Sequence, residues 1–581
     1  MDADDLLAEL DPEQREVALA TRGPVCVLAG AGTGKTRAIT HRIAYAVATG
    51  VVNPAHVLAL TFTVRAAGEL RGRLRALGGG AETVRASTFH SAALRQLTYF
   101  WPRVIGGRPP KLVESKQPLL REAARDLGVR LDGPALADAA AEIEWAKVCQ
   151  THPDSYVYAA AAAGRAPSAG IEVVGRLYQA YERLRRDRQL IDFESVLELT
   201  AAILYTEPAM AREVHGAFRY FTVDEFQDVN PLQKLLLDAW LGGRDDLCVV
   251  GDPQQTIYSF TGATASYLRE FTADYPGATV VRLVRDYRST PQVVAAASRL
   301  AAGGAAGSHA VSLVAQRPAG PEPSVSRYAD DEAEAAGVAA QAALLIGRGV
   351  PPQEIAVLVR VNAHMERFEH ALAAAKVPYV VRGAERFYER PEVRQALVLL
   401  RGAARAESAD ADATGSPGEL AAAVRHVLAS AGLAAEPPAA RGAVRERWES
   451  LAAIVALAED MAASCPDLSL AGFAAELARR AETGHAPQAS AVTLATMHAA
   501  KGLEWDAVLI PGLADGIMPI VHARTAQAVE EERRLLYVAV TRAREHLYLS
   551  WASARAPGAE QSRQRSRFLS ALLPQVAVSQ P

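Results

Sequence analysis

A glycine-rich stretch near the N-terminus carries the clearest chemistry in this sequence. The apolar run Val25–Leu28 is followed by Ala29-Gly30-Ala31-Gly32-Thr33-Gly34-Lys35-Thr36. Glycines let backbone N–H groups approach phosphate oxygens, because no Cβ stands in the way. A helix that begins here adds the positive end of its dipole. We therefore predict a phosphate-binding loop in which Lys35 reaches the β- and γ-phosphates of a nucleotide and the Thr36 hydroxyl holds Mg²⁺.

Acidic residues end two later apolar runs. Tyr220–Val223 leads into Asp224 and Glu225, and Leu247–Gly251 leads into Asp252. Neighbouring acidic residues in a loop usually form a solvated turn. A carboxylate at a strand end that faces a phosphate loop can instead hold Mg²⁺, and a second one beside it can orient the attacking water. The phosphate loop upstream favours this second interpretation.

These side chains need a scaffold, and the apolar pattern indicates one. Short apolar runs alternate with helical stretches, which predicts a parallel sheet whose carboxyl ends carry the ligand. The first set of runs is Val25–Leu28, Val57–Thr63, Val84–Ser87, Tyr220–Glu225 and Leu247–Asp252. A second α/β pattern begins near Ile355–Val359, resumes at Val492–Thr496 and Ala507–Ile510, and closes with Leu547–Ser550.

Two Ala-rich helical segments interrupt these patterns, so we predict an α/β protein with two motor domains, each with a helical insertion. The first motor takes residues 1–91 and 214–276, with 92–213 as its insertion. The second takes 277–387 and 489–570, with 388–488 as its insertion and 571–581 as a tail. Stretches rich in Ala, Gly, Ser and Pro at 301–308 and 317–321 resemble linkers.

Composition narrows the class of protein. With 581 residues the chain is too long for one core, and 62 basic against 66 acidic residues leave a net charge of -4. This balance neither demands nor excludes nucleic acid, because a binding groove needs only a local basic lining. Four scattered cysteines indicate neither a zinc site nor a disulfide framework. An acidic N-terminus and the lack of a long apolar run predict a cytoplasmic protein without a membrane partner.

Seven motifs, in order along the chain, resemble the UvrD/Rep/PcrA branch of superfamily 1 DNA helicases. They are Gln14, the phosphate loop, and the stretches at 223–228, 251–258, 286–289, 496–504 and 537–543. Residues 259–263 and 501–506 look closest to the second UvrD-like paralogue of actinobacteria. The resemblance implies RecA-like motors that use ATP and Mg²⁺ to move 3′ to 5′ on single-stranded DNA, in repair or replication.

The resemblance also implies a role for each matching residue at the nucleotide. Asp224 completes the metal site and Glu225 activates water. Gln255 senses the γ-phosphate, and both arginine fingers, Arg288 and Arg542, are expected in the second motor, so that hydrolysis requires closure of the cleft. The remaining matches bind the nucleotide: Gln14 at the adenine, Tyr287 stacked on the base, Arg37 nearby and Glu504 at the ribose.

For single-stranded DNA the same motifs imply a set of aromatic, hydroxyl and histidine contacts. Aromatic rings stack on bases without sequence preference, whereas hydroxyls and histidine serve phosphates. The set is Thr61, Phe62, Thr63, Thr88, Phe89, His90, Tyr258, Phe260 and His498. For Phe62 and Phe89, simple core packing is an equally good interpretation of the sequence alone.

Some features depart from the family. Phe260-Thr261 stands where relatives have Trp-Arg, the second insertion is short, and no C-terminal accessory module is expected. Partners are expected to be single-stranded DNA, single-strand/duplex junctions, and repair proteins or a second copy of the chain. Three alternatives stay open: a DNA-stimulated ATPase that translocates or strips proteins without efficient unwinding, the motor half of a helicase-nuclease, and a phosphate-loop switch or kinase that does not act on DNA.

Overall fold

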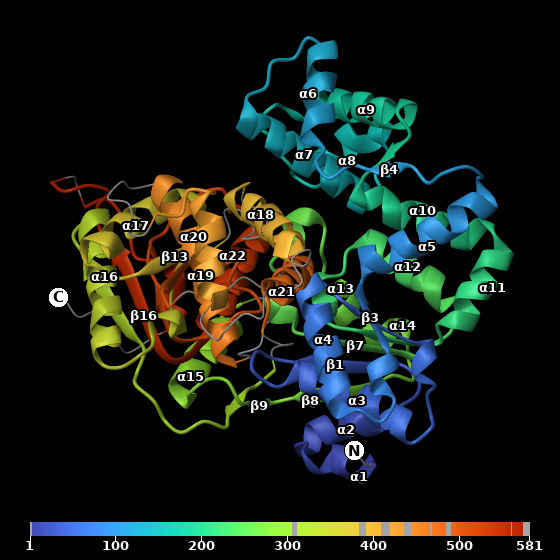
Figure 1. Ribbon diagram of the computed structural model, residues 1–581, viewed down its shortest axis with the longest axis horizontal. Coiled ribbons are helices and arrows are strands. Elements are labelled where there is room, and N and C mark those ends of the chain that lie inside the picture. The colour runs from blue at the N-terminus through green and yellow to red at the C-terminus, as the bar shows by residue number, and fades with distance from the viewer. Residues whose placement is uncertain are drawn as a thin grey trace. The chain divides into compact units, whose positions relative to one another are not determined.

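The structure is a computed structural model that describes residues 3–304, 311–382, 391–407, 419–434, 443–464, 468–483, 490–558 and 561–572 (Figure 1). The chain separates into two compact units. Unit 1 comprises Met1–Arg288 with Gly304–Gln316, and unit 2 comprises Ser289–Gly303 with Arg317–Pro581. No helix among the described residues is long and apolar enough to cross a membrane.

Unit 1 is built on a six-stranded parallel sheet with the strand order β3-β2-β6-β7-β1-β8. Alternate residues of its inner strands face two different hydrophobic cores, so these strands appear in the sequence as continuous apolar runs. The strands are β1 (Val25–Ala29), β2 (Val57–Thr61), β3 (Arg85–Thr88), β6 (Tyr220–Val223), β7 (Leu247–Gly251) and β8 (Thr279–Leu283).

Helices cover both faces of this sheet. One core contains residues from α1 (Ala3–Ala8), α2 (Pro12–Leu19), α3 (Lys35–Ala48) and α4 (Val64–Leu77). The other contains residues from α5 (Phe89–Val104), α10 (Phe193–Thr206), α11 (Pro208–Ala217), α12 (Pro231–Leu241), α13 (Ser266–Arg269) and α14 (Phe271–Asp274).

The helical insertion of unit 1 has a core of its own. It joins α6 (Gln117–Asp126), α7 (Gly133–Val148), α8 (Tyr156–Ala162) and α9 (Ile171–Asp187), which Figure 1 shows packed together. The short parallel pair β4 (Lys111–Leu112) and β5 (Leu190–Ile191) lies at the two ends of this segment. The predicted insertion at 92–213 therefore includes α10 and α11, which pack on the sheet core instead.

The first compact unit extends past residue 277, the predicted start of the second motor. β8 pairs with β1 along Thr279–Leu283, so residues up to Arg288 belong to unit 1. A further parallel pair, β9 (Arg285–Asp286) with β10 (Val314–Ala315), brings Gly304–Gln316 back to the same unit. Between them, α15 (Pro291–Ala302) belongs to unit 2.

Unit 2 repeats the architecture with a parallel sheet in the order β11-β16-β15-β12-β14-β13. Its strands are β11 (Ser324–Tyr328), β12 (Ile355–Val359), β13 (Tyr379–Arg382), β14 (Val492–Thr496), β15 (Trp505–Ile510) and β16 (Ala543–Ala552). The accompanying helices are α15, α16 (Asp331–Gly347), α17 (Met365–Ala374), α22 (Ala526–Val540) and α23 (Arg567–Leu572). The predicted α/β fold class, with two parallel sheets, is confirmed.

The second insertion is also helical and has a separate core. Its helices are α18 (Pro391–Glu407), α19 (Glu419–Ala429), α20 (Ala443–Ser464) and α21 (Leu470–Thr483). α23 continues past the predicted boundary at residue 570, and Leu572 is buried. Cys26, Cys149 and Cys248 are free thiols, while Cys465 lies outside the described residues.

Candidate nucleotide site and nucleic-acid interface

The phosphate loop lies between the end of β1 and the start of α3. Gly32 and Gly34 have φ angles of 72° and 76°, a region that favours glycine. A Cβ on Gly32 would lie 2.6 Å from Oδ2 of Asp286, and one on Gly34 would lie 2.6 Å from Nε2 of Gln14. Thr33 closes the turn by donating from Oγ1 to the Gly30 carbonyl at 3.0 Å. Ala29 and Ala31 of the loop are buried, so the loop packs against the rest of unit 1.

Lys35 points its ammonium into this site. Its Nζ atom is buried and finds no hydrogen-bond acceptor in the part of the chain that the structure describes. Glu225 Oε1 lies 3.8 Å away, beyond hydrogen-bonding distance. A buried cation without an acceptor is costly, and phosphate oxygens would supply acceptors. The geometry therefore fits a bound phosphate group.

The carboxylates of Asp224 and Glu225 lie close enough for their charges to interact. Burial, and then the charge of Glu225, raises the pKa of Asp224 to about 7. A divalent ion beside Asp224 would stabilise its charged form, and Thr36 at the start of α3 is the other expected ligand. The described residues contain no cluster of three His, Cys, Asp or Glu side chains able to hold a metal. Mg²⁺ bound here would take its other ligands from phosphate and water.

Glu225 is held in place by an amide-carboxylate chain that our sequence analysis did not identify. Gln227 donates from Nε2 to the Glu225 carboxylate, and its Oε1 accepts from the Asp252 N–H at 3.1 Å. Gln255 donates from Nε2 to Asp252 Oδ2 at 2.9 Å. Glu225 itself adopts φ 53°, a strained conformation for a residue other than glycine. The chain of contacts links the expected γ-phosphate sensor to the expected water-activating residue.

The expected base-binding residues also surround the phosphate loop. Gln14 is buried and donates from Nε2 to the Thr33 carbonyl at 3.1 Å. Tyr287 donates from its backbone N–H to the Gly32 carbonyl at 3.0 Å, and its exposed ring donates from OH to Asp11 at 2.6 Å. Arg37 instead donates to the carbonyl and side chain of Glu9.

Arg288, which the resemblance places in the second motor, belongs to compact unit 1. It closes unit 1, where its N–H donates to Asp286 Oδ1 at 2.8 Å. A Cβ on Gly32 would lie 2.8 Å from the Cβ of Arg288. This arginine therefore stands beside the phosphate loop within a single unit, because β9 and β10 attach its segment there.

Three expected residues lie in unit 2. Arg542 is buried, and its guanidinium donates to the Val538 carbonyl at 2.9 Å and the Leu503 carbonyl at 3.1 Å. Glu504 accepts from Arg544 at 3.0 Å, a partner that sequence reasoning missed. Burial lowers the pKa of His498 to about 4.

Three neighbouring aromatic rings form a row in unit 1, with a partly buried ring between two exposed ones. Phe62 stacks on Tyr258 with ring centres 5.6 Å apart and planes 14° apart, and Phe260 follows at 6.2 Å from Tyr258. Phe62 is 42% exposed and Phe260 is 52% exposed. Phe89 differs: it is 3% exposed and stacks on Trp240 in the core. This packing against α12 favours the core interpretation of Phe89 over the expected role in base stacking.

The polar residues expected at DNA have mixed surroundings. Thr63 and Thr88 cap helices, since each side chain accepts an N–H from the first turn of α4 or α5. Thr61 is buried. His90 lies edge-on to Phe193, at 6.0 Å between ring centres, and burial lowers its pKa to about 4. Both rings line a hollow of about 470 Å³ with Lys116 and Glu194.

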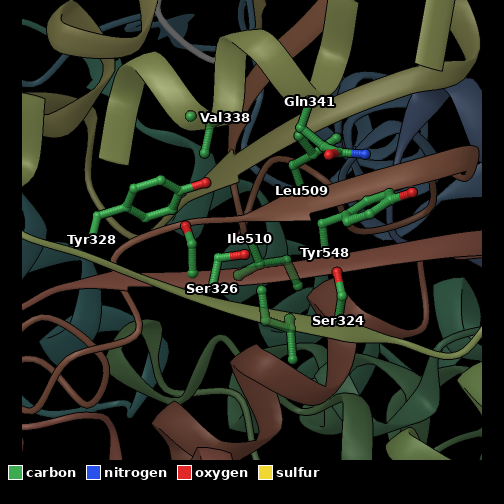
Figure 2. Close-up of a pocket in the computed structure, with 11 residues that line it drawn as sticks. Ser324, Ser326, Tyr328, Val338, Gln341, Leu509, Ile510 and Tyr548 are labelled. Atoms are coloured by element: carbon green, nitrogen blue, oxygen red, sulfur yellow. The ribbon is translucent and has the colours of Figure 1, made fainter. Parts of the chain in front are cut away.

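Another hollow, in unit 2, is too small for a nucleotide. Figure 2 shows Ser324, Ser326 and Tyr328 of β11 facing Gln341 of α16 and Tyr548 of β16. Its volume of about 50 Å³ has room for a few water molecules at most. The hydroxyl and amide groups that line it suit water.

A glycine loop on a parallel sheet, with strand-end carboxylates near its lysine, defines a phosphate-loop nucleotide-binding protein. Residues 10–276 match the UvrD/REP helicase N-terminal domain, and residues 281–411 with 421–554 match the UvrD-like helicase C-terminal domain. The chain belongs to the UvrD/Rep helicase family.

Similarity to individual proteins extends over the whole sequence. The ATP-dependent DNA helicase UvrD2 of Mycobacterium tuberculosis strain H37Rv is 52% identical, covering 99% of this chain and 83% of that protein. UvrD1 of the same strain is 32% identical over 98% of this chain and 85% of its own length. PcrA of Bacillus subtilis is 29% identical over 97% of this chain and 86% of its own length. The expected likeness to the second actinobacterial paralogue is confirmed.

Proposed function

We propose that this protein is an ATP-dependent DNA helicase that moves 3′ to 5′ along single-stranded DNA and acts in DNA repair or replication. The observation that carries the nucleotide part is the buried Lys35 ammonium without an acceptor, beside Asp224 and Glu225. The relatives support the DNA part, since UvrD2, UvrD1 and PcrA are all named ATP-dependent DNA helicases.

In this proposal the residues of unit 1 bind Mg²⁺-ATP and prepare water for attack. Lys35 and the loop N–H groups bind the phosphates, while Thr36 and Asp224 would hold the metal, which would neutralise charge on the transferred phosphoryl group. Glu225 accepts the proton of the water whose oxygen forms the new bond to phosphorus as the bond to ADP breaks. Gln227 fixes the Glu225 carboxylate, and Arg288 is placed to stabilise negative charge.

Single-stranded DNA is proposed to bind over the aromatic row. Phe62, Tyr258 and Phe260 present rings to bases, a sequence-tolerant contact worth about 1 to 3 kcal/mol per base. Phe193 and His90 add a second aromatic pair, which lines a hollow of unit 1. Junctions of single-stranded and duplex DNA are the proposed substrates, with repair proteins or a second copy of the chain as partners.

A second candidate is a DNA-stimulated ATPase that translocates without efficient unwinding. Thr261 favours it, because this side chain is uncharged and its hydroxyl donates to the Tyr258 carbonyl at 2.8 Å. It thus supplies no cation to hold a DNA strand next to Phe260.

ATP hydrolysis with and without single-stranded DNA tests the proposal, and strand displacement separates its two forms. Stimulated hydrolysis with displacement of a duplex supports the helicase. Stimulated hydrolysis with translocation alone supports the second candidate. Hydrolysis that is indifferent to DNA would overturn both and revive the switch or kinase.

A further inference from the structure

Arg165 lies between α8 and α9 of the first insertion and is held by two side chains. Its Nε lies 2.9 Å from both carboxylate oxygens of Glu142, and Nη2 lies 2.7 Å from Oε1. The guanidinium carbon lies 4.5 Å from the centre of the Trp145 ring. Tyr156 fixes the same carboxylate by donating to Oε2 at 2.8 Å. The guanidinium is therefore pre-organised by groups of the insertion itself.

The remaining arm of this guanidinium reaches the aromatic row. Nη1 donates to the backbone carbonyl of Phe260 at 3.3 Å. Close packing anchors the same loop at Gly262, where a Cβ would lie 2.7 Å from Cγ1 of Val148 at the end of α7. The loop that carries Phe260 thus rests on the insertion at two points, one polar and one apolar.

We propose that Arg165 is a positioning residue that holds Phe260 ready to stack on a DNA base. This role rests on the proposed function. An exposed ring on a loop loses conformational freedom when it stacks, so a loop fixed in advance binds more tightly. The helical insertion then contributes to the grip on single-stranded DNA through one hydrogen bond to the backbone.

A direct contact between Arg165 and a DNA phosphate is the competing role, and the surroundings disfavour it. The Arg165 side chain is 19% exposed, and the paired Glu142 carboxylate neutralises its charge. The two roles differ in salt dependence. A phosphate contact on a single strand adds about 0.7 to the slope of log affinity against log salt concentration, whereas a positioning residue adds none.

The test compares Arg165→Ala with Arg176→Ala, which removes an exposed arginine from α9 of the same insertion. We expect Arg165→Ala to raise the concentration of oligo(dT) at half-maximal ATPase activity about three- to tenfold. This loss corresponds to part of the binding free energy that stacking of one base contributes. The salt slope of oligo(dT) binding should stay at the wild-type value. Arg176→Ala should change neither quantity.

Epistasis with Phe260→Ala decides whether Arg165 acts through that ring. In the positioning role, adding Arg165→Ala to Phe260→Ala causes no further loss. Tyr156→Phe, which loosens Glu142 but keeps the buried ring, should give a smaller effect in the same direction and carries the test if Arg165→Ala does not fold. Additive losses, a reduced salt slope, or equal behaviour of Arg165→Ala and Arg176→Ala would overturn the proposal. No response of the unmodified protein to oligo(dT) would instead overturn the proposed function, and this role with it.

Discussion

At the scale of single residues, Lys35 and Glu225 lie 3.8 Å apart but have different proposed roles, phosphate binding and proton acceptance. Glu225→Gln keeps the side-chain volume and leaves Lys35 and Asp224 in place for phosphate and metal. We expect this variant to bind ATP and single-stranded DNA with little change and to lose turnover by about two orders of magnitude or more, because it cannot accept a proton. Steady-state ATPase assays measure turnover, and titrations with nucleotide and single-stranded DNA measure binding.

Lys35→Ala provides the contrast for that experiment. It removes the ammonium proposed to bind the phosphates in both the ground state and the transition state, so ATP binding and turnover should fall together. A Glu225→Gln protein that turns over ATP normally, or that has lost ATP binding to the extent of Lys35→Ala, would contradict the role of Glu225.

Two phenylalanines of similar sequence context are predicted to behave differently. Phe89→Ala should destabilise the fold by about 3 to 5 kcal/mol, because it empties a core position against Trp240. Phe62→Ala should leave stability almost unchanged and weaken oligo(dT) binding by about tenfold or more, since it removes an exposed stacking surface. Urea unfolding and fluorescence anisotropy check the pair. Weakened DNA binding by a stably folded Phe89→Ala protein would instead support base stacking by Phe89.

This pair shows where sequence reasoning ends at the residue scale. Lys35, Asp224 and Glu225 could be singled out from the sequence, because Lys35 follows a glycine-rich loop and the two carboxylates follow an apolar run. Phe62 and Phe89 both follow a threonine at a strand end, so local pattern could not separate them. Trp240 decides between them, and it is distant in the chain.

At the scale of elements, a buried ion cluster joins three helices of the first insertion region. Lys147 of α7 donates to Glu182 of α9 at 2.9 Å, to Asp192 at 2.8 Å, and to Ser195 of α10 at 2.9 Å. The Lys147 side chain is 4% exposed. Lys147→Met should therefore cost about 3 to 5 kcal/mol, because it removes the cation bound to the buried Asp192 carboxylate, while Glu182 keeps its ion pair with Arg185.

Chemical denaturation of the full chain measures that cost, with Lys111→Met as the control. Lys111 is an exposed lysine of β4 in the same region, so its loss should change stability by less than about 0.5 kcal/mol. Equal stability of the two variants would show that the cluster contributes little to the insertion.

Within the two six-stranded sheets, the strands that escaped sequence analysis lie at the edges. β8, β11 and β13 contain several residues that are only partly buried, so they lack the continuous apolar run that marks an inner strand. The inner strands were all found for the opposite reason. Because β8 leaves no such run, the expected boundary falls before it, whereas compact unit 1 extends through β8 to Arg288.

At the scale of the whole molecule, the repeated architecture was predictable but the path of the chain between the units was not. Two α/β patterns, each interrupted by helices, indicated two parallel sheets. The sequence indicated a single domain boundary near residue 277. In the structure the chain leaves unit 1 after residue 288, returns to it after 303 and leaves it again after 316. Only pairing of short strands such as β9 and β10 shows this, and two-residue strands leave no periodicity to detect.

The last prediction concerns direction of movement, a property of the entire motor. The family resemblance implies 3′ to 5′ travel, so a protein loaded on single-stranded DNA should advance toward the 5′ end. We expect ATP-dependent displacement of streptavidin from a 5′-biotinylated oligonucleotide and none from a 3′-biotinylated one. A duplex with a 3′ single-stranded tail should likewise be separated in preference to one with a 5′ tail, because only the 3′ tail lets the motor run into the duplex.

Glu225→Gln is the control for that measurement, since it should hold DNA without moving. Each base-pair step opened costs about 1.4 kcal/mol on average, so the streptavidin assay, which opens no base pairs, reports direction even if unwinding is weak. Displacement from the 3′ end alone would reverse the assigned direction. Displacement from both ends at the rate of Glu225→Gln would mean that spontaneous release, rather than a motor, was measured.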